Sequence, residues 1–210
     1  MEFSQDGLKW MKAMLKRFID ISFSITGLVI FFPLLVIISL AIKIEDRGPV
    51  LFCQERIGRF GKKFTILKFR SMSPVKSHKS IGFEPGDKSR ITKTGSIIRK
   101  TKLDELPQLL NVLKGEMSFV GPRPEVEYWV NKYPERWKRV HQLRPGITDN
   151  ASIEFRNEED ILEKASDPAQ EYEKNILPTK LSFYEQYILN RSIAGDFKII
   201  IQTIFTLLKN

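Results

Sequence analysis

The stretch "ISFSITGLVIFFPLLVIISLAI", Ile21 to Ile42, contains no charged residue and decides what kind of protein this is. At about 1.5 Å per residue, a helix of this length is long enough to cross a hydrocarbon core of roughly 30 Å. A cleaved signal peptide does not fit, because the apolar run is too long and starts late, and no small-residue cleavage site follows it. We therefore predict a membrane segment that stays in the mature protein.

Pro33 lies near the middle of this stretch and divides it into two arms. Proline lacks the backbone N–H and crowds the preceding turn, so a kink or break is predicted there. Each arm, roughly 20 Å and 15 Å long, is too short to span a bilayer. Basic residues flank both ends, which favours the cytoplasm for both: Lys9, Lys12, Lys16 and Arg17 before the stretch, Lys43 and Arg47 after it. Two arrangements remain open, a re-entrant hairpin and one spanning helix that tolerates its proline.

Composition limits the partners and the kinds of metal site. The 210 residues are 42% hydrophobic, enough for one medium domain with its own core, and the formal charge of +9 points to an anionic partner. That partner is nucleic acid, an acidic membrane surface or a phosphorylated substrate. A single cysteine, Cys53, excludes an intrachain disulfide, and two histidines exclude a His/Cys metal cluster. Any metal would be a hard ion on oxygen ligands, such as Mg²⁺.

Beyond residue 46 the sequence is typical of a water-soluble domain. Two β segments, Val50 to Gln54 and Lys63 to Met72, are predicted on either side of a glycine-bearing turn. Lys68 and Arg70 lie two residues apart and so share one face of the second strand, as a cationic site or as a solvated edge. The polar segment from 73 to 90 is predicted to be a loop, and a loop of this length can cover a site.

The stretch "TKLDELPQLLNVLKGEMSFVGPRPE", Thr101 to Glu125, places two adjacent carboxylates ahead of a short amphipathic helix. Pro107 is tolerated in a first turn, so the helix is predicted to start near Asp104 as its N-cap and to stop before Gly115. An acidic helix start is an ordinary structural feature. A helix N-terminus also binds phosphate, and a carboxylate there can act as a nucleophile or a Mg²⁺ ligand.

Two phosphates and a carboxylate repel one another, so a site of this kind needs cations. Arg99 and Lys100 precede the carboxylates, Arg123 stands between two prolines, and Arg144 precedes a third. Prolines restrict the backbone around an arginine, which suits a guanidinium held ready for a phosphate oxygen. Near the C-terminus, apolar residues recur at helical spacing, and this helix could lie on a bilayer or pack in a core: Phe197, Ile200, Ile201, Ile204, Phe205 and Leu208.

From about Lys16 onward the chain resembles the bacterial sugar transferase family, the monotopic phosphoglycosyl transferases. The matching pieces occur in order: "KRFIDI", "GPVLFCQERIGRFGKKFTILKFRSM", "TKTGSIIRKTKLDELPQLLNVLKGEMSFVGPRPE" and "LRPGIT". The resemblance implies an α+β fold, with a re-entrant helix-break-helix in residues 1–46. A small mixed helical and β catalytic domain, residues 47–210, would follow, with amphipathic helices at the membrane surface. It also implies a monotopic protein on the cytoplasmic face of the bacterial inner membrane, in contact with lipid, with a homodimer as a candidate assembly.

The same resemblance implies transfer of a sugar 1-phosphate from a UDP-sugar to polyprenyl phosphate, with Mg²⁺ as cofactor and release of UMP. Asp104 would be the nucleophile that forms a covalent phosphosugar intermediate, and Asp104 and Glu105 would bind Mg²⁺. Glu105 would alternatively assist deprotonation of the acceptor. The phosphate-binding positions would be Lys68, Arg99, Arg123 and Arg156, and Pro33 would be the membrane break.

Two departures from the family pattern limit these implications. Phe32 precedes Pro33 where members often have serine, and "RPGIT" is followed by "DNASIEFRN" rather than by the usual Gly-Trp and Asn-Gly-Arg-Asn segments. The sugar therefore stays open. Two other classes are less consistent with the motifs: a basic peripheral membrane module without catalysis, and a membrane-tethered nucleic-acid binder, for which no recognition motif is visible.

Overall fold

The computed structural model describes residues 5–73 and 90–209, so most of the loop predicted for residues 73–90 lies outside the described residues. The chain begins with α1 (Gln5–Asp46) and continues in the order β1 (Leu51–Ile57), η1 (Arg59–Gly61), β2 (Lys63–Phe69), α2 (Lys93–Lys100), η2 (Leu103–Glu105), α3 (Gln108–Lys114), β3 (Ser118–Val120), α4 (Glu127–Val130), α5 (Pro134–Val140), β4 (Gly146–Thr148), α6 (Asn150–Glu154), α7 (Glu158–Lys164), α8 (Pro168–Glu171), η3 (Tyr172–Ile176), α9 (Leu177–Asn190) and α10 (Ile193–Leu208). The predicted mixture of helices and short strands is confirmed.

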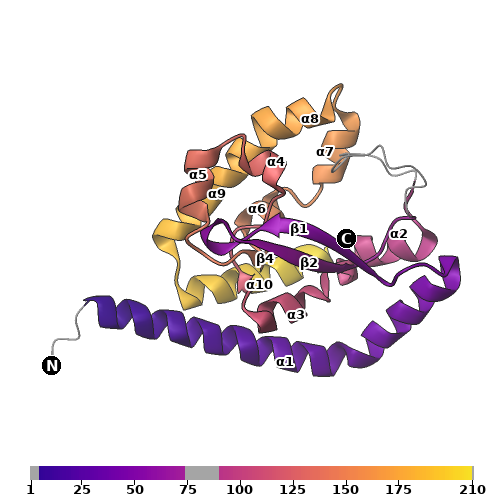
Figure 1. Ribbon diagram of the computed structural model, residues 1–210, viewed down its shortest axis with the longest axis horizontal. Coiled ribbons are helices and arrows are strands. Elements are labelled where there is room, and N and C mark those ends of the chain that lie inside the picture. The colour runs from indigo at the N-terminus through magenta and orange to yellow at the C-terminus, as the bar shows by residue number, and fades with distance from the viewer. Residues whose placement is uncertain (1–4, 74–89, 210) are drawn as a thin grey trace.

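Helix α1 contains the whole apolar stretch and lies along one side of the other elements (Figure 1). The helix is not interrupted at Pro33, so the sequence-predicted break takes the form of a change in axis direction in the second half of α1. Most of its large apolar side chains are exposed. By length and composition α1 can cross a membrane, and only 11% of its most apolar window is buried.

One narrow face of α1 packs against the rest of the molecule. The carboxylate of Asp20 is buried and accepts hydrogen bonds from the Ser118 hydroxyl (3.0 Å) and the Phe119 N–H (3.1 Å). A Cβ added to Gly27 would lie 3.2 Å from a methyl carbon of Leu109, so α1 and α3 approach closely there. Ile38 and Ile42 are buried with Phe69 and Ile98 in a second contact. The polar and apolar contacts together hold α1 in a defined position.

Strands β1 and β2 form the predicted antiparallel hairpin, with Leu51 opposite Phe69 and Ile57 opposite Lys63. The turn lies at η1, where Phe60 adopts φ 60 and Gly61 φ 72. The second strand ends at Phe69, earlier than predicted. Arg70, just beyond the strand, still donates its N–H to the Val50 carbonyl at 2.9 Å, and its side chain forms an ion pair with Asp46 at the end of α1, whereas Lys68 pairs with Glu105.

Strands β3 and β4 form a short parallel pair, with Ser118 opposite Gly146 and Val120 opposite Thr148. The chains cross so closely that a Cβ on Gly146 would lie 2.1 Å from the backbone nitrogen of Gly121. Only glycine fits this crossing. It positions the "GPRP" turn beside the "RPGIT" segment.

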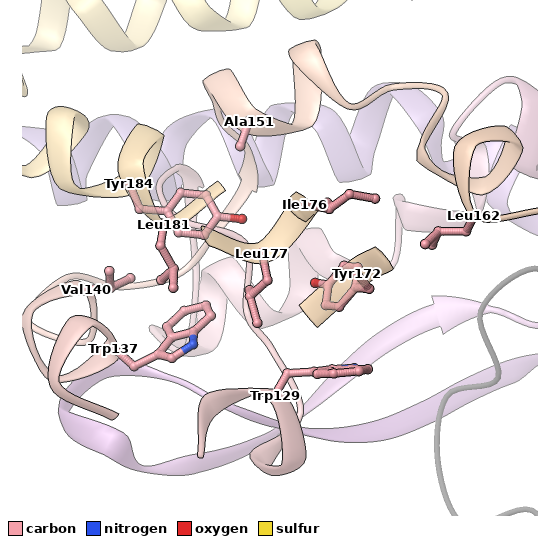
Figure 2. Close-up of a cluster of buried hydrophobic side chains, with 10 residues drawn as sticks. All are labelled: Trp129, Trp137, Val140, Ala151, Leu162, Tyr172, Ile176, Leu177, Leu181 and Tyr184. Atoms are coloured by element: carbon pink, nitrogen blue, oxygen red, sulfur yellow. The ribbon is translucent and has the colours of Figure 1, made fainter. Parts of the chain in front are cut away.

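The largest core lies on the far side of the hairpin from α1, among α4 to α9. Figure 2 shows its side chains converging around Leu177: Trp129, Trp137, Val140, Ala151, Leu162, Tyr172, Ile176, Leu181 and Tyr184. Each large apolar side chain buried in this way contributes roughly 1.5–3 kcal/mol. This core supports the turns that carry the polar site described next.

Helix α10 confirms the predicted C-terminal helix. Part of its apolar surface is buried in the domain and the rest is exposed. Ile199 is buried, whereas Phe197, Ile201, Ile204, Phe205 and Leu208 are exposed. The stripe therefore extends beyond what the domain itself covers.

Candidate active site

Asp104 and Glu105 lie in a buried 3₁₀ turn between α2 and α3. Lys102, in the left-handed conformation at φ 56, turns the chain so that η2 can form, and Asp104 and Glu105 are only 8% and 9% exposed. Carboxylates buried to this extent require cations or hydrogen bonds. The predicted N-cap role of Asp104 is wrong, because Lys102 precedes η2 and Pro107 is the N-cap of α3, with no side-chain cap at either.

Glu105 is held by two cations from separate elements. The ammonium of Lys68, on β2, donates to Glu105 Oε1 at 2.8 Å, and the guanidinium of Arg123 donates to the same oxygen and to Oε2, the latter at 3.4 Å. Burial alone would raise the pKa of Glu105, but Arg123 and then Lys68 lower it well below the ordinary value. Glu105 is therefore a fixed anion at neutral pH.

Asp104 has a contrasting environment although it is adjacent in sequence. Its Oδ1 is buried and has no hydrogen-bond partner among the described residues. Burial, and then the charge of Glu105, raise the pKa of Asp104; the charges of Lys68, Lys102 and Arg99 oppose this without cancelling it. Two neighbouring carboxylates with pKa values displaced in opposite directions are typical of functional sites.

The other predicted cations are placed as follows. The guanidinium of Arg99, at the end of α2, forms an ion pair with Glu159 and lies 3.5 Å from the Ser71 hydroxyl, so it acts on Asp104 only by its charge. Arg156 donates to the Thr206 carbonyl on α10 at 3.1 Å. Arg144 donates from Nε to the Gly115 carbonyl at 2.8 Å. Of the four predicted phosphate-binding residues, the structure brings Lys68 and Arg123 into contact with the carboxylate pair.

Two buried acids near Arg123 were not predicted. Asp149 caps α6 by accepting the Ser152 N–H at 3.0 Å; the charge of Glu105, and to a smaller extent that of Asp149, raises the pKa of Arg123. Glu125 accepts from Arg56 at 3.1 Å and from the Tyr172 hydroxyl. Asp149 directly follows "RPGIT" and Glu125 directly follows "GPRP". An acidic residue just after a predicted strand or turn was the sequence signal that could have identified both as site residues.

The donor set around the carboxylate pair is compatible with a hard cation. No group of three or more His, Cys, Asp or Glu side chains is assembled within residues 5–73 and 90–209, so the protein offers no complete metal cage there. Mg²⁺ commonly uses one or two carboxylates and completes its shell with substrate phosphates and water. The unpartnered Oδ1 of Asp104 and the weakly paired Oε2 of Glu105 fit that pattern.

Comparison with known proteins places this geometry in context. Residues 11–210 match the sequence profile described as bacterial sugar transferase. The chain is 37% identical to "UDP-glucose:undecaprenyl-phosphate glucose-1-phosphate transferase" of Escherichia coli (strain K12), over 94% of this chain and 41% of the relative. It is 36% identical to "UDP-N-acetylgalactosamine-undecaprenyl-phosphate N-acetylgalactosaminephosphotransferase" of Aeromonas hydrophila, over 93% of this chain and 44% of the relative.

A third relative is covered more completely. The chain is 35% identical to "UDP-glucose:undecaprenyl-phosphate glucose-1-phosphate transferase" of Caulobacter vibrioides, over 92% of this chain and 69% of the relative. The chain thus spans less than half the length of the first two relatives, and its similarity lies in the part that they share with it.

Proposed function

The chain belongs to the bacterial sugar transferase family, and from this membership we propose that it transfers a sugar 1-phosphate from a UDP-sugar to a polyprenyl phosphate. The relatives are named for reactions of this type with undecaprenyl phosphate. The observation that carries the proposal is the pair of buried carboxylates, one fixed by two cations and the other with an unpartnered oxygen. The product would be a polyprenyl-diphosphate-sugar, the first intermediate of a lipid-linked glycan.

In the proposed reaction Asp104 is the nucleophile. Its carboxylate oxygen attacks the β-phosphorus of the UDP-sugar, and the bond from that phosphorus to the bridging oxygen breaks, so UMP leaves with the electron pair. An oxygen of polyprenyl phosphate then attacks the same phosphorus, and the bond to Asp104 breaks to regenerate the carboxylate. The two displacements make a ping-pong sequence. Displacement at phosphorus requires positioning and charge neutralisation more than proton transfer, which matches the cations around Glu105.

The structure favours one of the two roles open to Glu105. A general base works best when its pKa lies near the operating pH. Arg123 and Lys68 outweigh burial and hold the pKa of Glu105 well below the ordinary carboxyl value, so it is poorly suited to deprotonate the acceptor. We therefore assign Glu105 to the other open role, binding Mg²⁺, and its ion pairs also hold Lys68 and Arg123 where the diphosphate would bind. Mg²⁺, held by Asp104 and Glu105, would supply further neutralisation of the phosphate charge.

We place the protein on the cytoplasmic face of the bacterial inner membrane, with α1 re-entrant. Three observations support this placement: the exposed apolar surface of α1, its bend, and the basic residues near both ends. Cysteines introduced singly at Lys12 and Ile44, in a Cys53→Ser background, should react with an impermeant thiol reagent from the same side of sealed vesicles. Reaction from opposite sides would show a spanning helix.

The reaction is tested by incubating the detergent-purified chain with a panel of UDP-sugars, undecaprenyl phosphate and Mg²⁺, and measuring UMP. For at least one sugar, donor alone should release at most about one UMP per protein, and repeated turnover with continued release of UMP should require the acceptor as well. Binding to anionic vesicles without UMP from any donor would instead identify a membrane module without catalysis.

In the profile of kcat/KM against pH, the fall on the acidic side should lie at a higher pH than an aspartate of ordinary pKa would give. Burial and the Glu105 charge raise the pKa of Asp104 above its ordinary value of 3.8, and only the ionised form attacks phosphorus, so kcat/KM should fall as the pH drops through that raised pKa. Glu105→Gln removes the neighbouring negative charge and should move this fall to lower pH. Profiles of UMP release against pH for both proteins measure this, and a wild-type midpoint at or below 3.8 would contradict it.

A further inference from the structure

Four arginines gather at the end of α3 that is farthest from the catalytic carboxylates. The guanidinium of Arg17, on α1, donates to the carbonyls of Val112 (2.7 Å) and Leu113 (3.0 Å), and Arg144 donates to the carbonyl of Gly115. Arg59, at the hairpin turn, donates from Nε to the Gln142 carbonyl at 3.1 Å. Arg191, between α9 and α10, acts on Arg59 by its charge, and we call these four residues the arginine cluster.

The cluster holds more positive than negative charge: the carboxylate of Asp20 acts on Arg17 by its charge but forms no ion pair with it. None of its four members forms an ion pair with a carboxylate in the described part of the chain. Burial and then the charge of Arg144 lower the pKa of both Arg17 and Arg59, and Arg191 adds to this at Arg59. The guanidinium groups are therefore close enough to repel one another, which an anion between them would relieve.

The way the side chains are anchored leaves donors available. Arg59 and Arg144 each use Nε for a backbone carbonyl, and their Nη groups have no hydrogen-bond partner among the described residues. Two guanidinium groups fixed in this manner present a preorganised edge for phosphate oxygens. Favourable interaction with the carbonyl end of α3 explains the position of Arg17 and Arg144. It does not explain why Arg59 and Arg191 are brought to the same place.

Apolar surface borders the cluster on two sides. The uncharged stretch of α1 starts four residues after Arg17, and α10, with its exposed Phe197 and Ile201, starts two residues after Arg191. Phe60 is 66% exposed beside Arg59, whose guanidinium lies 4.4 Å from the ring centre. Figure 1 shows the hairpin turn, the junction of α9 and α10 and the first half of α1 on the same side of the view. A phosphate joined to acyl chains matches this combination of charge and apolar surface.

We propose that the arginine cluster binds the headgroup phosphate of an anionic phospholipid at the membrane surface. The site is separate from the catalytic pair, since the seven residues of α3, roughly 10 Å of helix, lie between them. The proposal rests on the proposed membrane placement of α1, and it is independent of the reaction. Its role would be to fix the orientation of the domain on the bilayer.

The test uses the full chain purified in an uncharged detergent and follows thermal unfolding by tryptophan fluorescence. Dioctanoyl phosphatidylglycerol should raise Tm in a saturable manner, whereas dioctanoylglycerol, which lacks the phosphate, should not. In Arg59→Gln/Arg144→Gln the apparent affinity for phosphatidylglycerol should fall about tenfold, close to 1.4 kcal/mol. The matched control is Arg139→Gln, because Arg139 is a 65% exposed arginine of α5 outside the cluster.

Two further titrations identify which kind of molecule binds to the arginine cluster. An equal rise of Tm with inorganic phosphate alone would overturn the assignment to a lipid, and a cluster-dependent rise with farnesyl phosphate but not with phosphatidylglycerol would assign the site to the acceptor instead. An unchanged response in the double variant would overturn the site itself. If that variant has a lower Tm without lipid, Arg191→Gln provides the comparison, because Arg191 is exposed and its side chain forms no hydrogen bond or ion pair with the described residues. Its apparent affinity should still fall severalfold.

Discussion

Asp104→Asn should lower the rate of UMP release by roughly a thousandfold or more and abolish the covalent phosphosugar adduct. The amide has the same shape but cannot attack phosphorus, and it places no negative charge beside the incoming diphosphate. UMP release and intact-protein mass after incubation with donor alone measure the two effects. Donor binding should persist, because Lys68 and Arg123 remain in place.

The structure makes this variant a clean test of chemistry. Asp104 caps no helix, and its Oδ1 accepts no hydrogen bond in the described residues, so the substitution removes no folding contact of that oxygen. The free energy of unfolding should change by less than about 1 kcal/mol. Asp167→Asn is the matched control, since Asp167 caps α8 through the Gln170 N–H, asparagine caps equally well, and activity should be retained. Full activity in Asp104→Asn would exclude the nucleophile role.

Glu105→Gln should lower the free energy of unfolding by about 3 kcal/mol, the largest stability effect we expect from a single charge. Glu105, Lys68 and Arg123 have side chains only 10%, 19% and 30% exposed, and removing the shared anion leaves two poorly solvated cations without a partner. Equilibrium denaturation monitored by tryptophan fluorescence measures the loss. Glu185→Gln breaks the more exposed pair with Arg136 and should cost less than about 1 kcal/mol.

Two readouts distinguish this electrostatic cause from a general packing defect. UDP should stabilise Glu105→Gln more than it stabilises the wild type, because its diphosphate replaces the missing anion between Lys68 and Arg123. The variant should also lose less stability in acid. Since the folded pKa of Glu105 lies below its ordinary value of 4.5, its contribution is present above that pH and disappears as the pH falls below it. A cost no larger than that of Glu185→Gln would contradict the account.

The elements that carry the site could be predicted from the sequence where they depend on the pattern of neighbouring residues. The hairpin, the short helix ending at Gly115 and the long apolar helix follow from residue periodicity and glycine placement, and all are present. Lys68 and Arg123 were expected near the carboxylates, and they contact Glu105. The catalytic and phosphate-binding roles of these residues remain predictions.

The features of the site that the sequence did not predict depend on the local backbone conformation and on contacts between residues far apart in the sequence. Pro107 became the N-cap of α3 because Lys102 adopts a left-handed turn and η2 intervenes, and no residue pattern marks such a turn. Arg99 was expected at the phosphates but pairs with Glu159, which lies 60 residues later. Asp149 lies close enough to act on Arg123 because β3 and β4 pair and cross at two glycines.

The close approach of α1 and α3 at Gly27 and Leu109 bears on how far the proposed lipid acceptor would have to move to reach the site. Leu109 lies four residues after Glu105, about one helical turn, and Gly27 lies within the apolar stretch. With that stretch in the bilayer, as proposed, we expect Asp104 and Glu105 to lie near the level where a lipid's phosphate meets its hydrocarbon chain. Withdrawing such a chain into water costs about 0.8 kcal/mol for each CH₂. The proposed reaction at this depth would leave the polyprenyl tail dissolved in the membrane throughout, so that only its phosphate would need to enter the protein.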